Sequence, residues 1–321
     1  MKESLNKSFL TVVVFLVATL LSVNAWAEKQ IGFLLFSEES RYTEAAKGIK
    51  DKLSKAGYTE SNTHYIIAKA AANKAKALEL VQEFSREKLD LIITIGTSAT
   101  VIVANEIKDV PIVFSVIYDP VEAGIAKSWK SSGNNTTGSS TKVPIVKVLE
   151  SLKLLRPVKR LAVLYTSGEK NSEAVVRDLQ NVQVKLGIKI IPVIVSTNDD
   201  IDQIFPQVLS NVDGVYITGS NMVDSRIRTI VDMANKAGVI TVSHLDDLIE
   251  KGVLVGVCAD AYSVGSLAGE KAVKILHGAK PSSLPIGLPE KFEVMLNMKT
   301  VKNGHFPIPP EFMKTVTKKI E

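Results

Sequence analysis

The sequence has few of the residues that form covalent or metal cross-links. Its 321 residues include one cysteine, Cys258, and four scattered histidines. A single cysteine excludes an intramolecular disulfide, so the hydrophobic core alone must stabilise the fold. Zinc sites need cysteine and histidine ligands at short spacings, and the sequence has no such cluster. We therefore expect neither a metal nor a cofactor, and we expect Cys258, which lies in an apolar run, to be an inert core residue.

Long blocks of positive charge are also missing. The formal net charge is +5, and lysines alternate with acidic residues along the chain. Proteins that follow a phosphate backbone gather positive charge in one region, and the sequence has no zinc-finger or N-terminal helix-turn-helix pattern. Nucleic acid is therefore not an expected partner.

Catalytic motifs are absent from the sequence as well. It contains no G-x-S-x-G nucleophile elbow and no P-loop. Ser98 has no histidine near it along the chain, although the base of a serine nucleophile need not be a sequence neighbour. We expect the protein not to be an enzyme. The alternative is a periplasmic enzyme with the same kind of α/β fold as this chain. A turnover assay on amino-acid and ester substrates would distinguish the two.

The N-terminal apolar run is too short for a full membrane span. Residues 9–23 are almost continuously apolar, whereas a transmembrane helix needs about 20 such residues. Lys2 and Lys7 precede the run, and Ala25-Trp26-Ala27 follows it with the small-x-small form that signal peptidase accepts. We predict a cleaved signal peptide over residues 1–27 and a periplasmic mature protein. An uncleaved membrane anchor is the alternative.

The clearest pattern in the mature chain is a βαβ unit. The run Leu91–Ile95 is apolar on both faces and rich in β-branched residues, which predicts a strand buried in a parallel sheet. Helical spacing begins after Gly96, with Thr97 or Ser98 as the expected N-cap, and a second buried strand covers 112–117. The junction offers free N–H groups, a positive dipole end and hydroxyl donors, so it suits a carboxylate or another anion. The alternative is a capped helix with no ligand.

Strands and helices alternate through the rest of the mature chain, and polar loops follow the strands. This pattern predicts an α/β fold with two Rossmann-like lobes, each a mostly parallel sheet flanked by helices, joined by a hinge that the chain crosses more than once. A ligand would lie in the cleft between the lobes. The predicted boundaries are 28–140 plus about 253–280 for the first lobe, 141–252 plus about 281–300 for the second, and 301–321 for a C-terminal tail.

Several short motifs, in their order and spacing, resemble those of one bacterial family. They are Gly96-Thr97-Ser98-Ala99, Pro111-Ile112-Val113-Phe114, Asp119-Pro120-Val121-Glu122-Ala123-Gly124, Gly133-Asn134-Asn135-Thr136-Thr137-Gly138, Gly219-Ser220-Asn221, and Gly265 and Gly269 before Gly278. The family is that of the periplasmic substrate-binding proteins of ABC transporters, with members of the tryptophan/tyrosine type. The resemblance covers nearly the whole mature chain, and Thr137-Gly138-Ser139-Ser140 departs slightly from the more apolar family form.

The resemblance implies the type I periplasmic-binding fold and the role of a solute-binding component of an ABC importer. The protein would be a monomer that captures a small solute, most simply an aromatic or branched amino acid, and delivers it to an ABC permease in the inner membrane. A periplasmic sensory protein that binds a sugar, nucleoside or other small molecule without transport is the alternative, and the sequence does not separate the two.

An amino-acid ligand makes three chemical demands, and the strand ends supply candidates for each. Thr97 and Ser98 are the candidates for the ligand carboxylate. Asp119 and Asp260 are the candidates for its ammonium group. The alternatives are an Asx-turn ahead of the following proline for Asp119 and the N-cap of the next helix for Asp260.

The walls of the cleft need apolar, aromatic and polar side chains. Phe36, Tyr118 and Tyr165 end their strands where a cleft is expected, with core packing as the alternative. The remaining candidates are polar residues that follow other strands: Glu38 and Ser40 in the first half, and Thr166, Ser220, Asn221 and His244 in the second. His244 could equally be a satisfied surface histidine.

Overall fold

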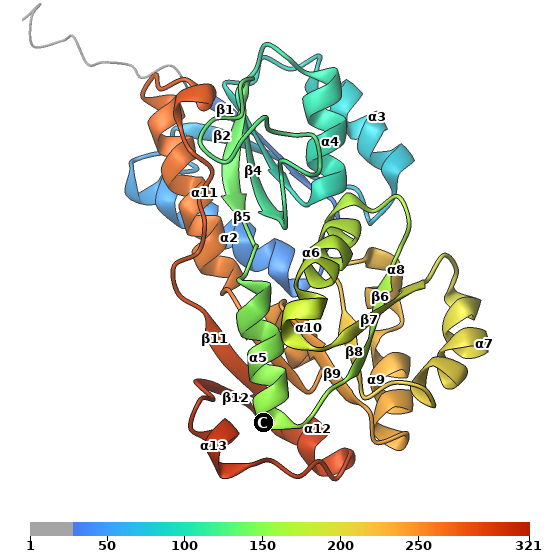
Figure 1. Ribbon diagram of the computed structural model, residues 1–321. Coiled ribbons are helices and arrows are strands. Elements are labelled where there is room, and N and C mark those ends of the chain that lie inside the picture. The colour runs from blue at the N-terminus through green and yellow to red at the C-terminus, as the bar shows by residue number, and fades with distance from the viewer. Residues whose placement is uncertain (1–27) are drawn as a thin grey trace, which may run out of the picture.

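The protein is described here by a computed structural model that covers residues 28–321, so the predicted signal peptide at 1–27 lies outside the described residues. Two α/β bodies lie one above the other in Figure 1, and each contains one sheet flanked by helices. The described chain begins in the upper body and ends in the lower one. The predicted fold class is thereby confirmed.

The first lobe is built on a five-stranded parallel sheet with the order β2-β1-β3-β4-β5. Its strands are β1 (Lys29–Leu35), β2 (Thr63–Lys69), β3 (Leu91–Ile95), β4 (Ile112–Ile117) and β5 (Thr136–Ser140). Its helices are α2 (Ser40–Lys55), α3 (Lys74–Phe84), α4 (Thr97–Glu106) and α11 (Ala261–Leu276), with the 3-10 turn η1 (Pro281–Ser283). Every residue of β3, β4 and β5 is buried, because helices cover both faces of the sheet.

Helices α2 and α11 pack together closely on one face of this sheet, and glycines make the approach possible. A Cβ added at Gly265 would lie 2.1 Å from the carbonyl oxygen of Ala45, and one at Gly48 would lie 2.2 Å from that of Tyr262. Gly269 faces the same helix, where an added Cβ would lie 2.7 Å from Cβ of Lys52. These glycines therefore allow α11 to pack closely against α2.

The second lobe is built on a seven-stranded sheet with the order β12-β11-β10-β9-β8-β6-β7, in which only the β10–β11 pair is antiparallel. Its strands are β6 (Arg160–Tyr165), β7 (Lys189–Ile194), β8 (Gly214–Ile217), β9 (Ile240–Ser243), β10 (Val255–Cys258), β11 (Glu293–Asn297) and β12 (Lys318–Ile320). Its helices are α5 (Ile145–Leu155), α6 (Lys170–Leu186), α7 (Asn198–Leu209), α8 (Asn221–Ser225), α9 (Ile227–Lys236), α10 (Asp246–Glu250), α12 (Met298–Asn303) and α13 (Pro310–Met313).

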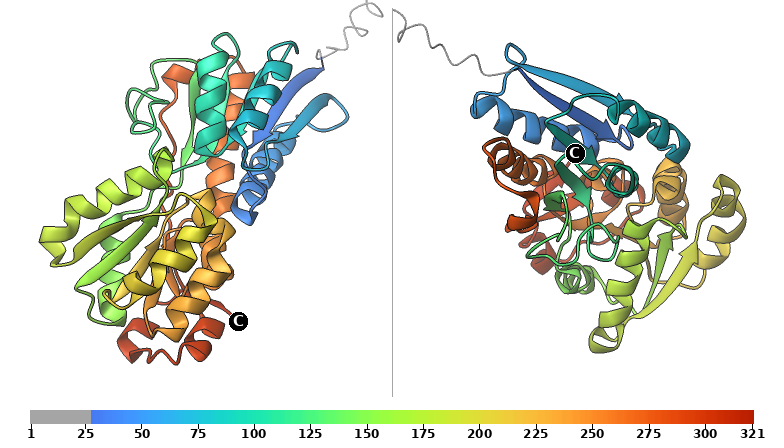
Figure 2. Two further views of the ribbon diagram at one scale, coloured as in Figure 1. Left: turned by 90° about the vertical axis from the view of Figure 1, so that its right-hand side faces the viewer. Right: turned by 90° about the horizontal axis from the view of Figure 1, so that it is seen from above.

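Within residues 28–321 the chain crosses between the lobes three times, in line with the expected multi-crossing hinge. The crossings run from β5 to α5, from β10 to α11 and from η1 to β11. The left view of Figure 2 shows the two bodies one above the other from a second direction. Three connections restrict the lobes to a hinge-like motion that opens or closes the space between them.

Three of the expected boundaries differ from the observed topology. The strand at Val255–Cys258 lies in the second sheet, between β9 and β11, and only α11 returns to the first lobe. The segment around Gly287 stays with the first lobe, where it bridges to Ser139. The C-terminal residues form no separate tail, because β12 pairs with β11 and Phe312 is fully buried. A short apolar strand fits either sheet equally well, so the sequence pattern could not assign it.

Candidate functional site

A narrow pocket lies between the two lobes, at the carboxyl ends of their parallel strands. The side chains that line it come from both bodies and from the first crossing. They are Phe36, Arg41, Tyr42, Thr97, Ser98, Val116 and Tyr118 from the first lobe, Thr141 from the crossing, and Asn171, Val175, Gly219, Asn221, His244 and Leu245 from the second lobe.

The N-terminus of α4 opens onto this pocket. Its N-cap is Gly96, at φ 101°, so neither Thr97 nor Ser98 caps the helix as expected. The left-handed conformation favours glycine, and an added Cβ at this position would also lie 2.6 Å from Cε1 of Tyr42. The backbone can therefore approach the Tyr42 ring, which is buried beside the pocket. Thr97 and Ser98 become the first two helical residues, with their hydroxyls next to free N–H groups.

Arg41 is the most confined charged group in the pocket, with 3% of its surface exposed. Its Nη1 donates to Oδ2 of Asp224 at 2.8 Å and to Oδ2 of Asp247 at 2.6 Å. Burial alone would lower the pKa of Arg41, but the neighbouring carboxylates, Asp247 first, raise it well above the usual value. The guanidinium therefore keeps its charge inside the interlobe space.

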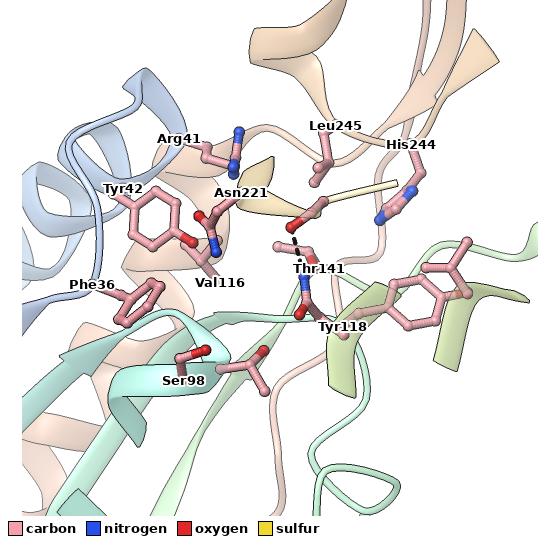
Figure 3. Close-up of a pocket in the computed structure, with 14 residues that line it drawn as sticks. Phe36, Arg41, Tyr42, Ser98, Val116, Tyr118, Thr141, Asn221, His244 and Leu245 are labelled. Carbon is pink, nitrogen blue, oxygen red and sulfur yellow. Dashed lines mark hydrogen bonds between the residues drawn. The ribbon is translucent and has the colours of Figure 1, made fainter. Parts of the chain in front are cut away.

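His244 lies on another side of the pocket from Arg41 (Figure 3), and its ring contacts the rings of Tyr118 and Tyr216. The Tyr118 ring meets His244 edge-on at 5.0 Å, and the hydroxyl of Tyr216 shares a 2.9 Å hydrogen bond with Nδ1 of His244. Burial, followed by the positive charge of Arg41, lowers the pKa of His244 to about 3. The imidazole is therefore neutral at neutral pH, and His244 is a buried residue of the pocket wall and not a surface histidine.

Several buried polar atoms of the pocket have no hydrogen-bond partner among residues 28–321. They are Nη2 of Arg41, Oγ1 of Thr97 and Oδ1 of Asn221, and Oε2 of Glu39 shares this property next to Arg41 in sequence. Nearly all buried polar groups in folded proteins are paired, because an unpaired one costs about 1–3 kcal/mol. Three such atoms in one pocket indicate a site built for a polar guest. Figure 3 shows Arg41, Asn221 and the α4 end around the same space.

The backbone of the pocket contains a conformation that is rare for its residue type. Val116, in the fully buried strand β4, has φ 57°, and the register of β4 against β5 shifts between Phe114 and Ile117. A β-branched residue at positive φ is strained, and such strain is found preferentially at functional sites. The irregularity places Val116 in the pocket lining.

Six of the predicted site residues line the pocket and seven do not. Those in the lining are Phe36, Thr97, Ser98, Tyr118, Asn221 and His244. Those outside it are Glu38, Ser40, Asp119, Tyr165, Thr166, Ser220 and Asp260. Most of the second group have local structural partners, because a polar side chain at a strand end can satisfy nearby backbone groups as easily as a ligand.

The two aspartates expected at the ammonium group show this most clearly. Asp119 accepts hydrogen bonds from the N–H groups of Val121 and Glu122, both at 3.0 Å, and from Nζ of Lys142 at 2.8 Å. Asp260 accepts from the N–H of Ser263 at 2.7 Å and is the N-cap of α11. Both side chains therefore have the structural roles that were their alternatives, the Asx-turn and the helix cap.

The other residues outside the lining have similar explanations. Ser220 caps α8 and its hydroxyl lies 2.7 Å from that of Thr166. Glu38 forms an exposed ion pair with Lys69. Ser40 is the first residue of α2, and Tyr165 ends β6 with a partly exposed side chain. These residues are close in sequence to residues that line the pocket, but they do not line it themselves.

Sequence reasoning missed Arg41, Tyr42, Val116, Thr141 and Asn171, among others. Arg41 and Tyr42 follow the predicted cleft loop directly, so the position of that loop at a strand end could have indicated them. The pattern offered no such signal for Val116, because its strand reads as ordinary core.

No group of three or more histidine, cysteine, aspartate or glutamate side chains within the described residues is arranged to hold a metal ion. No helix of residues 28–321 combines the length and the hydropathy needed to cross a bilayer. Cys258 is a free thiol, and it is 1% exposed in the core of the second lobe.

Comparisons with known proteins give one consistent family. A family model described as "ABC transporter substrate binding protein" matches residues 30–320. A tyrosine-binding protein of Clostridioides difficile (strain R20291) is 28% identical over 277 residues, which are 86% of this chain and 80% of that protein.

Two solved structures, both 26% identical to this chain, extend the comparison. One is a domain from Streptococcus pneumoniae in complex with L-Trp, with a TM-score of 0.86 and coverage of 91% of this chain and 100% of that one. The other is the ligand-free, open structure of a Clostridium difficile substrate-binding protein with adhesive properties, with a TM-score of 0.72 and the same coverage.

Proposed function

The chain belongs to the family of ABC transporter substrate-binding proteins, and we propose that it binds an aromatic amino acid in the interlobe pocket and delivers it to an ABC importer in the inner membrane. The family is one of solute-binding proteins and not of enzymes. We also propose that the mature protein is periplasmic, acts as a monomer and has lost residues 1–27 as a signal peptide. The observation that carries the proposal is the set of unpaired buried polar atoms in one pocket.

The ligand carboxylate would bind at the first-lobe side of the pocket. Nη2 of Arg41 and Oγ1 of Thr97 are both buried and unpaired among the described residues, and the free N–H groups of α4 begin beside Thr97. A guanidinium, a hydroxyl and a helix N-terminus all favour an anionic oxygen. This arrangement supports the carboxylate role proposed for Thr97 and Ser98 and adds Arg41 to it.

The ligand ammonium would pair with Oδ1 of Asn221, which lines the pocket, and with Glu39, which lies outside the lining and two residues before Arg41 in sequence. Oε2 of Glu39 is buried without a partner in the described chain, as is Oδ1 of Asn221. Glu39 carries a negative charge close enough to raise the pKa of Tyr42, although burial is the larger cause there. Glu39 therefore takes the place of Asp119 and Asp260, whose oxygens already have structural partners.

The side chain of the ligand would lie among Phe36, Tyr42, Tyr118 and the neutral ring of His244. Aromatic rings prefer edge-to-face or offset contacts, which a wall of several rings can provide. A neutral imidazole is also suited to accept a hydrogen bond from a phenol or an indole N–H. These features favour an aromatic ligand over a branched aliphatic one.

The arrangement of the lobes agrees with a ligand-bound, closed state. At equal sequence identity the chain superimposes better on the L-Trp complex than on the open, ligand-free relative. A ligand that contacts both lobes binds the closed state more tightly and so shifts the population toward it. This supports lobe closure as the binding mechanism.

Isothermal titration of the refolded, ligand-free protein tests the proposal. We expect heat from tryptophan, tyrosine or phenylalanine, weaker heat from leucine and none from a sugar. Glu39→Gln should weaken amino-acid binding, whereas Glu38→Gln, one residue earlier and paired on the surface with Lys69, should not. Binding of a sugar or nucleoside in the absence of any amino-acid response would contradict the proposal.

A further inference from the structure

We propose that Arg41, Asp224, Asp247 and Lys251 form an interlobe latch, in which the two aspartates are positioning residues that hold Arg41 in the closed state. The inference rests on the proposed function for the identity of the ligand. Three of the four residues lie outside the pocket lining and would act on the ligand only through Arg41. The latch would be assembled when the lobes close and separated when they open.

The four residues come from opposite lobes. Arg41 is the second residue of α2 in the first lobe, whereas Asp224 is in α8 and Asp247 in α10 of the second. Arg41 is separated from the two aspartates by 183 and 206 residues along the chain. Helix α2 of the first lobe contacts α10 of the second. Opening of the hinge would therefore move the guanidinium away from both carboxylates.

Each carboxylate of the latch bridges two cations. Asp224 accepts from Arg41 at 2.8 Å through Oδ2 and from Lys251 at 2.7 Å through Oδ1. Oδ2 of Asp247 lies 2.6 Å from Arg41 and 3.4 Å from Nζ of Lys251. Two positive and two negative side chains make the latch electrically neutral, which is the condition under which buried charges are tolerated.

Burial distinguishes the latch from the other ion pairs that connect the lobes. The side chains of Arg41, Asp224 and Asp247 are each 3% exposed. Arg177 and Glu122 also connect the lobes, at 2.7 Å, but they are 44% and 51% exposed. Water screens an exposed ion pair, so such a pair contributes little to stability. Loss of one partner from a buried ion pair leaves an uncompensated charge.

The latch also explains how binding could be transmitted to closure. Nη1 of Arg41 is occupied by the second lobe, whereas Nη2 has no partner among residues 28–321 and is the group proposed to receive the ligand carboxylate. A single rigid guanidinium would thus contact the ligand with one nitrogen and the opposite lobe with the other. Removing a latch carboxylate should destabilise the closed state alone, because in the open state these groups are hydrated.

The test compares Asp247→Asn with Asp202→Asn, a control in which the lost carboxylate pairs with Arg226 at 2.8 Å inside the second lobe. We expect Asp247→Asn and Asp224→Asn to raise the Kd for the amino acid by about tenfold or more, since apparent affinity falls with the population of the closed state. Stopped-flow measurements should place this loss in the dissociation rate, with a change of the association rate below about threefold. Asp202→Asn should bind as the wild type does.

A charge-restoring variant separates the latch from simple loss of structure. Adding Lys251→Gln to Asp247→Asn makes the group neutral again, and we expect part of the affinity to return. If Asp247→Asn binds as tightly as the wild type, or if the double variant binds no better than the single one, the latch is overturned.

A ligand-independent measurement keeps the latch distinguishable from the proposed function. Spin labels at Lys108→Cys in the first lobe and Val184→Cys in the second report the distance between the lobes, and Cys258 is buried and free of label. We expect Asp247→Asn to reduce the closed fraction without ligand and at fixed ligand. If the wild type binds no amino acid, the proposed function is wrong. The latch is then tested only by the distance between the two spin labels without ligand. Equal closed fractions in wild type and Asp247→Asn would then overturn the latch.

Discussion

Two of the charged groups that connect the lobes differ in burial and in whether they include a residue of a crossing. The latch of Arg41, Asp224, Asp247 and Lys251 joins segments far apart in sequence, and its residues other than Lys251 are each 3% exposed. The second group, which we call the hinge cluster, consists of Tyr118, Asp119, Lys142 and Asp178.

The hinge cluster is centred on a residue of the first crossing. Lys142 Nζ lies 2.8 Å from both Asp119 and Asp178, and the Tyr118 hydroxyl donates to Asp178 at 2.8 Å. Burial lowers the pKa of Lys142, but its hydrogen bonds to the two carboxylates raise it above the usual value overall. Lys142 belongs to the connecting segment, so we expect its contact with Asp119 of the first lobe to persist when the lobes open. We therefore expect the hinge cluster to stabilise the connection between the lobes, whereas the latch forms when the lobes close.

The largest expected effect follows from Arg41→Met. This change removes the proposed contact with the ligand carboxylate and leaves two buried aspartates with only Lys251 as a partner. Removal of one partner from a buried ion pair costs about 3–5 kcal/mol, so we expect the Kd for the amino acid to rise more than about a hundredfold. Titration calorimetry measures this. An unchanged affinity would show that Arg41 belongs neither to the site nor to the latch.

A steric change beside the latch should have the next largest effect. Gly96→Ala forces an alanine into φ 101° and places its Cβ 2.6 Å from the ring of Tyr42, the neighbour of Arg41. We expect a loss of stability of about 1–3 kcal/mol together with weaker ligand binding. Gly57→Ala is the matched control, since Gly57 has φ 94° but nothing within 4 Å of the added Cβ. The control should lose stability and keep its affinity; equal affinity losses in both variants would refute a local effect.

Replacing Lys142, the central residue of the hinge cluster, should affect stability more than ligand affinity. This is the opposite of what we expect for the latch. Lys142→Met removes the cation between Asp119 and Asp178, which are 6% and 24% exposed. We expect a loss of about 1 kcal/mol in the free energy of unfolding, and a smaller change in ligand affinity than Asp247→Asn causes. Urea unfolding and calorimetry on the same samples measure the two quantities. A larger effect on affinity than on stability would make the hinge cluster part of the closure mechanism.

The pH dependence of stability should reveal the neutral histidine between the two charged groups. The pKa of His244 is lowered to about 3, first by burial and then by Arg41, whereas in the unfolded chain it takes its ordinary value near 6.5. Between these values the unfolded state binds a proton that the folded state does not. Stability should therefore fall as pH falls below about 6.5, by up to about 1.4 kcal/mol per pH unit. Urea unfolding between pH 8 and pH 4 measures this, and His244→Phe should flatten the slope. An equal slope in wild type and variant would contradict a buried neutral imidazole.

The smallest expected effect on binding comes from Asp260→Ala. The side chain of Asp260 caps α11 through the N–H of Ser263 and lies outside the pocket lining. Loss of an N-cap costs about 1 kcal/mol of stability, and we expect the amino-acid affinity to change by less than about twofold. Thermal unfolding and calorimetry measure the two effects. A marked loss of affinity would return Asp260 to the site and weaken the assignment of the ammonium contact to Glu39.

Local sequence patterns were sufficient for most of the fold. The fully apolar runs of β3 and β4 predicted buried parallel strands, as the structure has them. The pattern failed where a short strand fits two sheets, as with Val255–Cys258, or where a short strand follows a proline-rich segment, as with β12. Strand pairing depends on partners elsewhere in the chain, so periodicity along one segment does not specify it.

The site was predicted in outline and not in its charged contacts. Phe36, Thr97 and His244 line the pocket because strand ends of parallel sheets meet at one edge, which follows from the fold class. The aspartates at the same edge could not be assigned in this way. A carboxylate at a strand end can accept local N–H groups, as Asp119 and Asp260 do, and the sequence does not reveal which outcome prevails.

The sequence by itself determined the two-lobed α/β architecture, its buried strands and the edge at which a ligand would lie, because these follow from hydrophobic periodicity and from short-range helix and turn chemistry. Only the tertiary structure decided that Arg41 meets Asp224 and Asp247 across the gap between the lobes. The physical reason is that charge pairing depends on the distance between groups in space, and that distance is set by how two separately folded lobes come together.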